Sequence, residues 1–201
     1  MNIEERFLKY VSFDTQSDKN IPILFHLLLK QLELGKELVK EMLEIGIEDA
    51  HLDEFGIVYG TIKGNSKNGD VIGFIAHMDT SPLMLAVKTS RNKTLQMPMV
   101  LSLNLTKMLN FCLDPKEFPS LKKMIGHDLI TTDGTRLLGA DDKAGVAIIM
   151  DLADYLSKHP EIKHNDIKVT FTPDEEVGRG TDNFDVKKFN AKYAYIDGWR
   201  C

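Results

Sequence analysis

The chain has 201 residues, of which 43% are hydrophobic and 27% are charged, and its net charge is −5. This composition is typical of a soluble globular domain, and the negative balance gives no electrostatic case for binding nucleic acid or an anionic membrane. Its two cysteines are too few for a disulfide framework or a cysteine-rich zinc site. Because cysteine is scarce and no signal peptide is recognisable, we expect a cytoplasmic protein.

The first part of the chain predicts two helices and three strands. Apolar residues at helical spacing indicate a helix over residues 3–12 and a longer one over residues 31–45, with Gly46 as its C-cap. The apolar run at residues 21–29 contains Pro22 and is too short to span a bilayer. Short strand-like segments predict strands at 50–55, 57–62 and 71–76, and the last two are rich in β-branched residues.

The second part of the chain predicts one strong helix and three further strands. The helix covers residues 144–156, where apolar side chains recur in phase. The strands are expected at residues 128–133, 167–171 and 193–196. The order of helices and strands predicts an α/β fold, in which a mixed and largely buried sheet is flanked by helices.

A tight turn at residues 137–145 joins an extended segment to the helix and carries two adjacent carboxylates, Asp141 and Asp142. Adjacent side chains do not easily share one direction, so we expect the two to have different roles. Two interpretations are open for the pair considered alone. It either caps the helix and complements the helix dipole, or it supplies oxygen ligands to a cation such as Zn²⁺ or Mn²⁺.

Four acidic or imidazole clusters lie where a predicted strand ends or a turn begins, and they are His77/Asp79, Asp141/Asp142, Glu175/Glu176 and Asp197. In open α/β sheets, ligands bind outside the carboxyl ends of the strands. Carboxylates crowded at such an edge repel one another and raise each other's pKa unless a cation is present. A pair of divalent metal ions would resolve that conflict.

The residue types suit such a site. His77 offers a neutral imidazole, and Asp79, two residues further along an extended segment, points the same way and can orient the ring. Asp141 is the candidate carboxylate to bridge two ions. One glutamate of the pair can bind metal while the other acts as general base, and Asp197 offers a ligand to the second ion. Each residue alone is better explained as an ordinary surface, loop or helix-capping residue, and only the joint pattern favours a metal site.

Several motifs resemble the peptidase T family, the tripeptide aminopeptidases among the co-catalytic zinc peptidases. The segments are FIAHMDTSP at 74–82, LITTDG at 129–134, LGADDKAG at 138–145 and FTPDEEVG at 171–178. The similarity is dense over residues 128–180 and also covers residues 1–17 and 31–81. It implies a zinc-exopeptidase-like catalytic domain that hydrolyses the N-terminal peptide bond of a tripeptide.

The resemblance also implies roles for individual residues. The implied zinc ligands, with Asp141 bridging two ions, are His77, Asp141, Glu176 and Asp197. The implied catalytic residues are Glu175, the general base that activates the bridging water, and Asp79, which supports His77. The substrate would be a small peptide.

Three features depart from the family pattern. Residues 1–201 would be the N-terminal portion of the catalytic domain, without the lid or dimerisation domain and without the C-terminal catalytic segment that brings a last histidine to the second zinc ion. The segments 19–30 and 83–104 and the C-terminus do not match, and we interpret them as products of frame changes. Divergent surface loops are the alternative for the two internal segments.

Three functions are therefore open: a zinc aminopeptidase acting on tripeptides, a related zinc-dependent dipeptidase or deacylase, and a non-catalytic gene remnant. The residues that remain do not decide between a monomer and a homodimer. Lys143, beside the two carboxylates, either screens charge at the site or is an ordinary solvated lysine.

Overall fold

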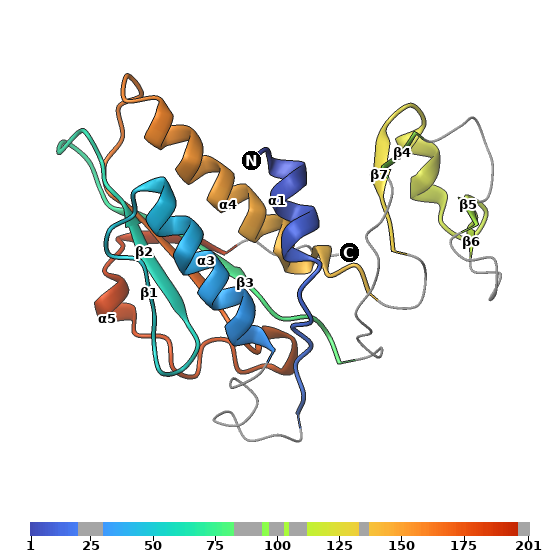
Figure 1. The fold of residues 1–201 in the computed structure, drawn as a ribbon, viewed down its shortest axis with the longest axis horizontal. Helices are drawn as coiled ribbons and strands as arrows, with labels where there is room; N and C mark the ends of the chain where they lie inside the picture. The colour runs from blue at the N-terminus through green and yellow to red at the C-terminus, as the bar shows by residue number, and fades with distance from the viewer. Residues whose placement is uncertain (20–29, 83–93, 97–102, 105–111, 133–136, 197–201) are drawn as a thin grey trace. The chain divides into compact units, whose positions relative to one another are not determined.

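The computed structural model describes residues 1–19, 30–82, 94–96, 103–104, 112–132 and 137–196 (Figure 1). The chain divides into two compact units. One consists of Met1–Leu83 and Gly139–Cys201, and the other of Met84–Leu138. Every candidate site residue belongs to the first unit.

The first unit is built on a five-stranded sheet of order β1-β2-β8-β3-β9. The strands are β1 (His51–Leu52), β2 (Val58–Ile62), β3 (Ile72–His77), β8 (Ile167–Thr172) and β9 (Tyr193–Ile196). Strands β1, β2 and β8 pair antiparallel, whereas β8, β3 and β9 run parallel to one another. The sheet is therefore mixed, which confirms the predicted fold class.

Three helices lie together on one face of this sheet: α1 (Ile3–Tyr10), α3 (Gln31–Ile45) and α4 (Ala140–Lys158) (Figure 1). Their apolar stripes meet alternate residues of the strands in one core. Its members include Leu38 and Met42 of α3, Met150 of α4 and Phe171 of β8, each fully buried. Burial of apolar surface is thus the main stabilising contribution on this face.

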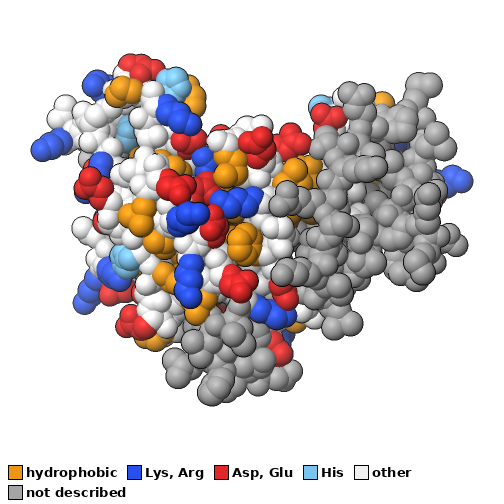
Figure 2. Space-filling view, in the orientation of Figure 1, with side chains coloured by type: hydrophobic (Ala, Val, Ile, Leu, Met, Phe, Trp, Pro, Cys, Tyr) orange, Lys and Arg blue, Asp and Glu red, His pale blue; other side chains and the backbone are white. Residues whose placement is uncertain are grey.

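Charged side chains complete the helical layer. The buried Arg6 of α1 forms ion pairs with Glu41 of α3 and, at 2.8 Å, with Asp154 of α4. Lys9 adds a contact of 3.0 Å to Glu41. At the surface, acidic and basic side chains are interspersed over the face shown in Figure 2. The helices are therefore held together by ion pairs as well as by apolar contacts.

The opposite face of the sheet carries a smaller apolar cluster, in which Ile57 and Tyr59 pack with Phe189 of the short helix α5 (Val186–Phe189). Gly73 of β3 permits this packing, because a Cβ atom there would lie 2.5 Å from the Phe189 ring. At the edge of the sheet, all four residues of β9 are exposed.

The second unit contains two short antiparallel pairs. Strand β4 (Thr94–Gln96) pairs with β7 (Asp128–Ile130), and β5 (Leu103–Asn104) pairs with β6 (Cys112–Leu113). A 3₁₀ helix, η1 (Pro119–Met124), lies between β6 and β7 in the chain. Among the described residues, no helix is both long and apolar enough to cross a membrane.

Most predicted elements in the first unit are confirmed. Helix α3 and strand β9 have the predicted bounds, and Gly46 caps α3 with a left-handed φ of 104°. The strand expected at 50–55 is shorter, and α5 was not predicted because four residues carry too little periodicity. The segments interpreted as frame changes, 19–30, 83–104 and the C-terminus, lie largely outside the described residues.

Candidate active site

The carboxyl ends of β3 and β8 meet at one edge of the sheet. The two strands are parallel, with His77 in register with Thr172. The Met78 N–H donates to the Thr172 carbonyl at 2.8 Å and extends the ladder by one residue. The turn that carries His77 and Asp79 therefore lies beside the turn that carries the two glutamates, as the sequence predicted.

Helix α4 brings its first turn to the same edge. The helix starts after Gly139, which has a left-handed φ of 73°, and a Cβ atom there would lie 2.6 Å from the Thr80 methyl group. Asp141 and Asp142 follow with non-helical dihedral angles. Glycine is thus needed at position 139 for both its conformation and the close approach of Thr80.

The two adjacent aspartates have different partners. Asp142 is buried, and its carboxylate accepts hydrogen bonds from the backbone N–H groups of His77 and Gly145, both at 3.2 Å. The side chain of Asp141 is 50% exposed, and its Oδ1 lies 3.2 Å from Nε2 of His77. Asp142 thus joins the start of α4 to β3, while Asp141 presents its carboxylate to the imidazole.

The His77 ring lies among three carboxylates. Nδ1 is 3.2 Å from Asp79 Oδ1, and Nε2 is 3.7 Å from Glu175 Oε2 as well as close to Asp141. Burial alone would lower the pKa of the imidazole, but the hydrogen bond and negative charge of Asp79 oppose it. With smaller contributions from Asp142 and Glu175, they raise the pKa of His77 to about 9.

Asp79 has a second role that the sequence did not predict. It is fully buried, and its two carboxylate oxygens accept the backbone N–H groups of Glu175 at 3.0 Å and Glu176 at 3.1 Å. One side chain therefore lies 3.2 Å from Nδ1 of the His77 imidazole and also holds the backbone of the turn that carries both glutamates.

The two glutamates differ in their surroundings. The Glu175 side chain is 59% exposed. Burial raises the pKa of Glu176, and the negative charges of Asp79, Asp141 and Glu175 raise it further against the opposing effect of His77. An upward shift of this kind is the expected consequence of crowded carboxylates.

Gln31, the first residue of α3, belongs to the same assembly and was missed. Its amide Nε2 donates to Asp174 Oδ1 at 2.8 Å, and its Oε1 accepts the Asp174 N–H at 3.2 Å. Asp174 has a left-handed φ of 56°, which is uncommon for a residue other than glycine. A glutamine that begins an amphipathic helix carries no local signal of such a contact.

Lys143 is not a solvated lysine, so that interpretation is wrong. It is 1% exposed, and its Nζ donates to the Phe13 carbonyl at 3.2 Å. The side chain extends along the first turn of α4 toward Gly139, where a Cβ atom would lie 3.6 Å from Lys143 Nζ. Its ammonium group joins that segment to the turn that carries Asp141 and Asp142.

Curated proteins are similar to this chain along nearly its whole length. No family model matches the chain. Peptidase T of Clostridium acetobutylicum is 52% identical over 96% of the chain, and peptidase T of Bacillus subtilis is 48% identical over 98%. The chain is a homologue of peptidase T. It spans about half the length of these curated relatives, since it covers 48% of each. The family resemblance of the motifs is thereby confirmed.

Solved structures show the same fold as this homologue of peptidase T. An aminopeptidase PepT from Bacillus cereus matches with a TM-score of 0.65 at 22% identity, over 98% of the chain and 43% of that protein. A tripeptidase from Staphylococcus aureus gives 0.64 at 19% identity, over 100% and 43%. A metallo-carboxypeptidase from Sulfolobus solfataricus gives 0.59 at 14% identity, over 99% and 38%. The zinc-exopeptidase-like fold predicted from the sequence is confirmed.

The separation of the His77 and Asp141 donor atoms suits a direct hydrogen bond and is also compatible with two ligands of one metal ion. Two ligands bound at 2.0–2.1 Å with a tetrahedral angle lie about 3.3 Å apart, close to the 3.2 Å between His77 Nε2 and Asp141 Oδ1. Within the described part of the chain, no group of three or more histidine, cysteine and acidic side chains is placed to hold a metal ion. The predicted ligand Asp197 lies outside the described residues. The structure thus brings together one pair of the four predicted ligands at a ligand-like distance.

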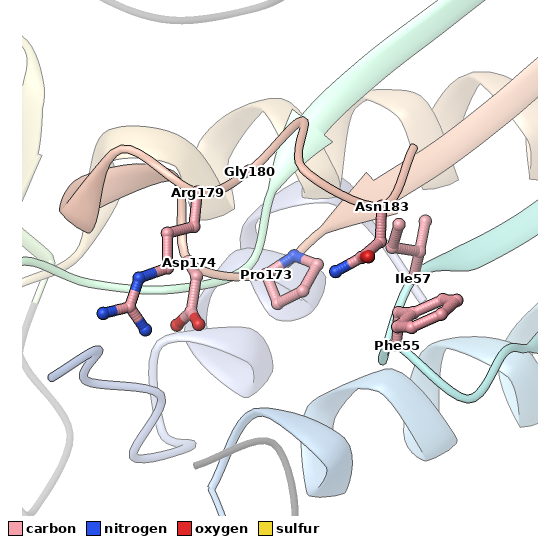
Figure 3. Close-up of a pocket in the computed structure, with 7 residues that line it drawn as sticks. All are labelled: Phe55, Ile57, Pro173, Asp174, Arg179, Gly180 and Asn183. Atoms are coloured by element: carbon pink, nitrogen blue, oxygen red, sulfur yellow. The ribbon is translucent and has the colours of Figure 1, made fainter. Parts of the chain in front are cut away.

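A shallow pocket borders the two-glutamate turn in this peptidase T homologue. It measures about 250 Å³, including space open to solvent, and is lined by Phe55, Ile57, Pro173, Asp174, Arg179, Gly180 and Asn183. In Figure 3, Asp174 and Arg179 project to one side of Pro173, and Phe55, Ile57 and Asn183 lie on the other. A Cβ atom on Gly180 would lie 3.1 Å from Glu175 Cα, so this wall of the pocket closely supports the turn.

Proposed function

We propose that this chain contributes the active site of a zinc-dependent aminopeptidase that releases the N-terminal residue from tripeptides in the cytoplasm. The observation that carries the proposal is the contact of His77 with Asp141 on one ring nitrogen and Asp79 on the other, at 3.2 Å each. The sequence identity of 52% and 48% to two peptidase T proteins, which extends along nearly the whole chain, supports tripeptides as the substrate class.

In this proposal the zinc ligands are His77, Asp141, Glu176 and Asp197, with Asp141 bridging two ions. Imidazole and carboxylate are the donors that zinc prefers in catalytic sites. When bound, zinc supplies Lewis-acid polarisation of the peptide carbonyl. The raised pKa of Glu176 is consistent with a place for a cation, because a positive charge there would relieve the repulsion between neighbouring carboxylates.

Glu175 would act as the general base. Its carboxylate is largely exposed, and Oε2 lies 3.7 Å from His77 Nε2, so it reaches the solvent space next to the candidate ligands. A carboxylate in that position accepts a proton from the attacking water at Oε2 and returns it to the leaving amine. Asp79 would keep the His77 ring and the glutamate backbone in place for this transfer.

Hydrolysis of a tripeptide by the full chain, with zinc added, tests the proposal. We expect Glu175→Gln to lower kcat by at least about 100-fold, because a general base contributes on the order of 10²–10⁴ in rate. The matched control is Glu161→Gln, an exposed glutamate away from the site, which should retain full activity. Equal activity of the two variants would contradict the role of Glu175.

Zinc titration by calorimetry is the companion measurement. We expect Asp141→Asn to weaken zinc binding and Asp151→Asn, a half-buried aspartate on α4 away from the site turns, to leave it unchanged. Zinc binding without any tripeptide hydrolysis would support the metal site and contradict the aminopeptidase activity, in favour of the non-catalytic alternative.

A further inference from the structure

Three consecutive backbone N–H groups of the two-glutamate turn each donate to a side-chain oxygen. The Asp174 N–H donates to Gln31 Oε1 at 3.2 Å, the Glu175 N–H to Asp79 Oδ1 at 3.0 Å, and the Glu176 N–H to Asp79 Oδ2 at 3.1 Å. A turn normally leaves such donors to water or to the backbone. Here two side chains from distant parts of the chain fix the course of the backbone through the turn.

Gln31 contacts this turn at two points. Besides accepting the Asp174 N–H, it donates its Nε2 hydrogen to Asp174 Oδ1 at 2.8 Å, so the pair is reciprocal. The two residues are 1% and 3% exposed, and water therefore cannot replace either bond. Among uncharged side chains of this length, only a primary amide offers both a donor and an acceptor in one plane.

Gln31 is held rigidly because it is the first residue of α3, a helix with a deeply buried face. Leu34 and Leu38, one and two turns further along α3, are fully buried in the main core. Asp79 lies just beyond the end of the interior strand β3 and is fully buried too. The turn is therefore anchored to the helical layer through Gln31 and to the sheet through Asp79.

We propose that Gln31 is a positioning residue for the glutamate pair. Its amide holds Asp174 in the left-handed conformation, and this conformation aims the following peptide groups at Asp79 and sets the directions of the Glu175 and Glu176 side chains. The inference rests on the proposed function for its catalytic consequence. The structural part, that the amide holds the turn, is testable without any activity.

The direct test is hydrogen exchange of the Asp174, Glu175 and Glu176 amides in the full chain, measured by NMR or by mass spectrometry of a peptide that covers 173–178. Gln31→Met keeps the length of the side chain and removes both hydrogen bonds. We expect exchange in the turn to accelerate at least about tenfold beyond any change in global stability, because two buried hydrogen bonds are lost.

The matched control for lost stability is Thr61→Val. Thr61 is buried in β2, and its hydroxyl donates to Asp49 at 2.5 Å, near the opposite end of the sheet. The variant loses the two part-buried hydrogen bonds of this hydroxyl, one donated to Asp49 and one accepted from Lys168, without touching the turn. Its exchange at residues 174–176 should therefore follow global stability alone. A second control, Asp174→Asn, keeps an oxygen acceptor for the Gln31 amide and tolerates the left-handed conformation, and it should exchange like the wild type.

Two further readouts connect the turn to the site. Gln31→Met should weaken zinc binding relative to Thr61→Val, and in a preparation that hydrolyses a tripeptide it should lower kcat while KM changes less than about twofold. Equal exchange at residues 174–176 in Gln31→Met and Thr61→Val would overturn the proposal. If Gln31→Met does not fold, faster exchange at these amides in Asp174→Asn than in the wild type would overturn it as well. A wild-type chain with no hydrolysis would contradict the proposed function, and the exchange comparison would still decide the role of Gln31.

Discussion

The helix-covered face of the sheet and the site turns at residues 77–79, 141–142 and 174–176 are held together by different forces. On the helix-covered face, many fully buried apolar side chains of α1, α3 and α4 contact one another and the strands. In the site turns, a few carboxylates and one side-chain amide accept hydrogen bonds from backbone N–H groups. Each of these N–H groups is held by one side chain. The first region contributes most of the free energy of unfolding, and the second sets the geometry of the site. Substitutions should therefore change the two properties separately.

The largest loss of stability is expected on the helix-covered face. Leu38→Ala removes a fully buried side chain of α3 and should lower the free energy of unfolding by about 3 kcal/mol, since it leaves a cavity in the core. Leu43→Ala on the same helix is the control, because Leu43 is 50% exposed and should change stability by less than about 0.5 kcal/mol. Urea denaturation measures both, and equal losses would contradict the assignment of the core.

A pair of neighbouring residues in the site turns should separate stability from site chemistry. Asp142→Ala leaves the buried N–H groups of His77 and Gly145 without an acceptor and should cost about 2 kcal/mol in the free energy of unfolding. Asp141→Ala removes a half-exposed carboxylate and should leave stability within about 0.5 kcal/mol of the wild type. Zinc calorimetry on the same proteins should show the stronger defect in Asp141→Ala. A stronger zinc-binding defect in Asp142→Ala than in Asp141→Ala would contradict the roles assigned to the two aspartates.

The ion pairs of the helical layer predict a pH dependence of stability. Burial alone would raise the pKa of Asp154, but its hydrogen bond with Lys158 and the charge of Arg6 outweigh this effect and lower the pKa below its usual value. A carboxylate with a depressed folded-state pKa stabilises the fold above the unfolded-state pKa, and this contribution is lost as the pH falls through the folded-state value. Asp154→Asn should therefore be less stable than the wild type at pH 7, with the difference shrinking below about pH 4. Urea denaturation from pH 3 to pH 7 checks this, and a constant difference would contradict it.

The smallest effect on stability is expected at the edge strand β9. All five residues of the interior strand β2 are buried, whereas Ile196 of β9 is 73% exposed. Ile196→Lys should change the free energy of unfolding by less than about 0.5 kcal/mol and reduce self-association, because a lysine on an edge strand opposes strand pairing between chains. Sedimentation velocity at increasing concentration measures the association. A loss of several kcal/mol would show that β9 belongs to the stable core.

Much of the architecture was predictable because its signals are local. The helical periodicity of residues 31–45 and the glycine after it define α3 and its end. The apolar run before His77 and the one before the Thr-Pro-Asp-Glu-Glu segment define β3 and β8, whose parallel pairing brings their carboxyl ends together. The predicted roles of His77, Asp79, Asp141, Glu175, Glu176 and Asp197 as ligands and catalytic residues stay predictions, and for Asp197 the structure describes no position.

Other parts of the site could not be predicted because they depend on contacts between distant residues. For Lys143 the sequence left open charge screening at the site or an ordinary solvated lysine, and the structure buries it where the first turn of α4 meets the segment after α1. Asp79 was expected to orient His77, and its bonds to two glutamate amides follow only from the pairing of β3 with β8. The frame-change interpretation of residues 19–30, 83–104 and the C-terminus is likewise untested by the described residues.

The sequence by itself determined most of the helices and strands of the first unit, the mixed α/β fold and the sheet edge at which the acidic clusters meet. Periodicity, turn residues and strand ends are properties of short segments. Only the tertiary structure decided which polar groups satisfy one another. Gln31 and Asp174 are 143 positions apart, and His77 and Asp142 are 65 apart. The local sequence around these residues does not predict either hydrogen bond, because a buried donor pairs with whichever acceptor the packing of the elements places beside it.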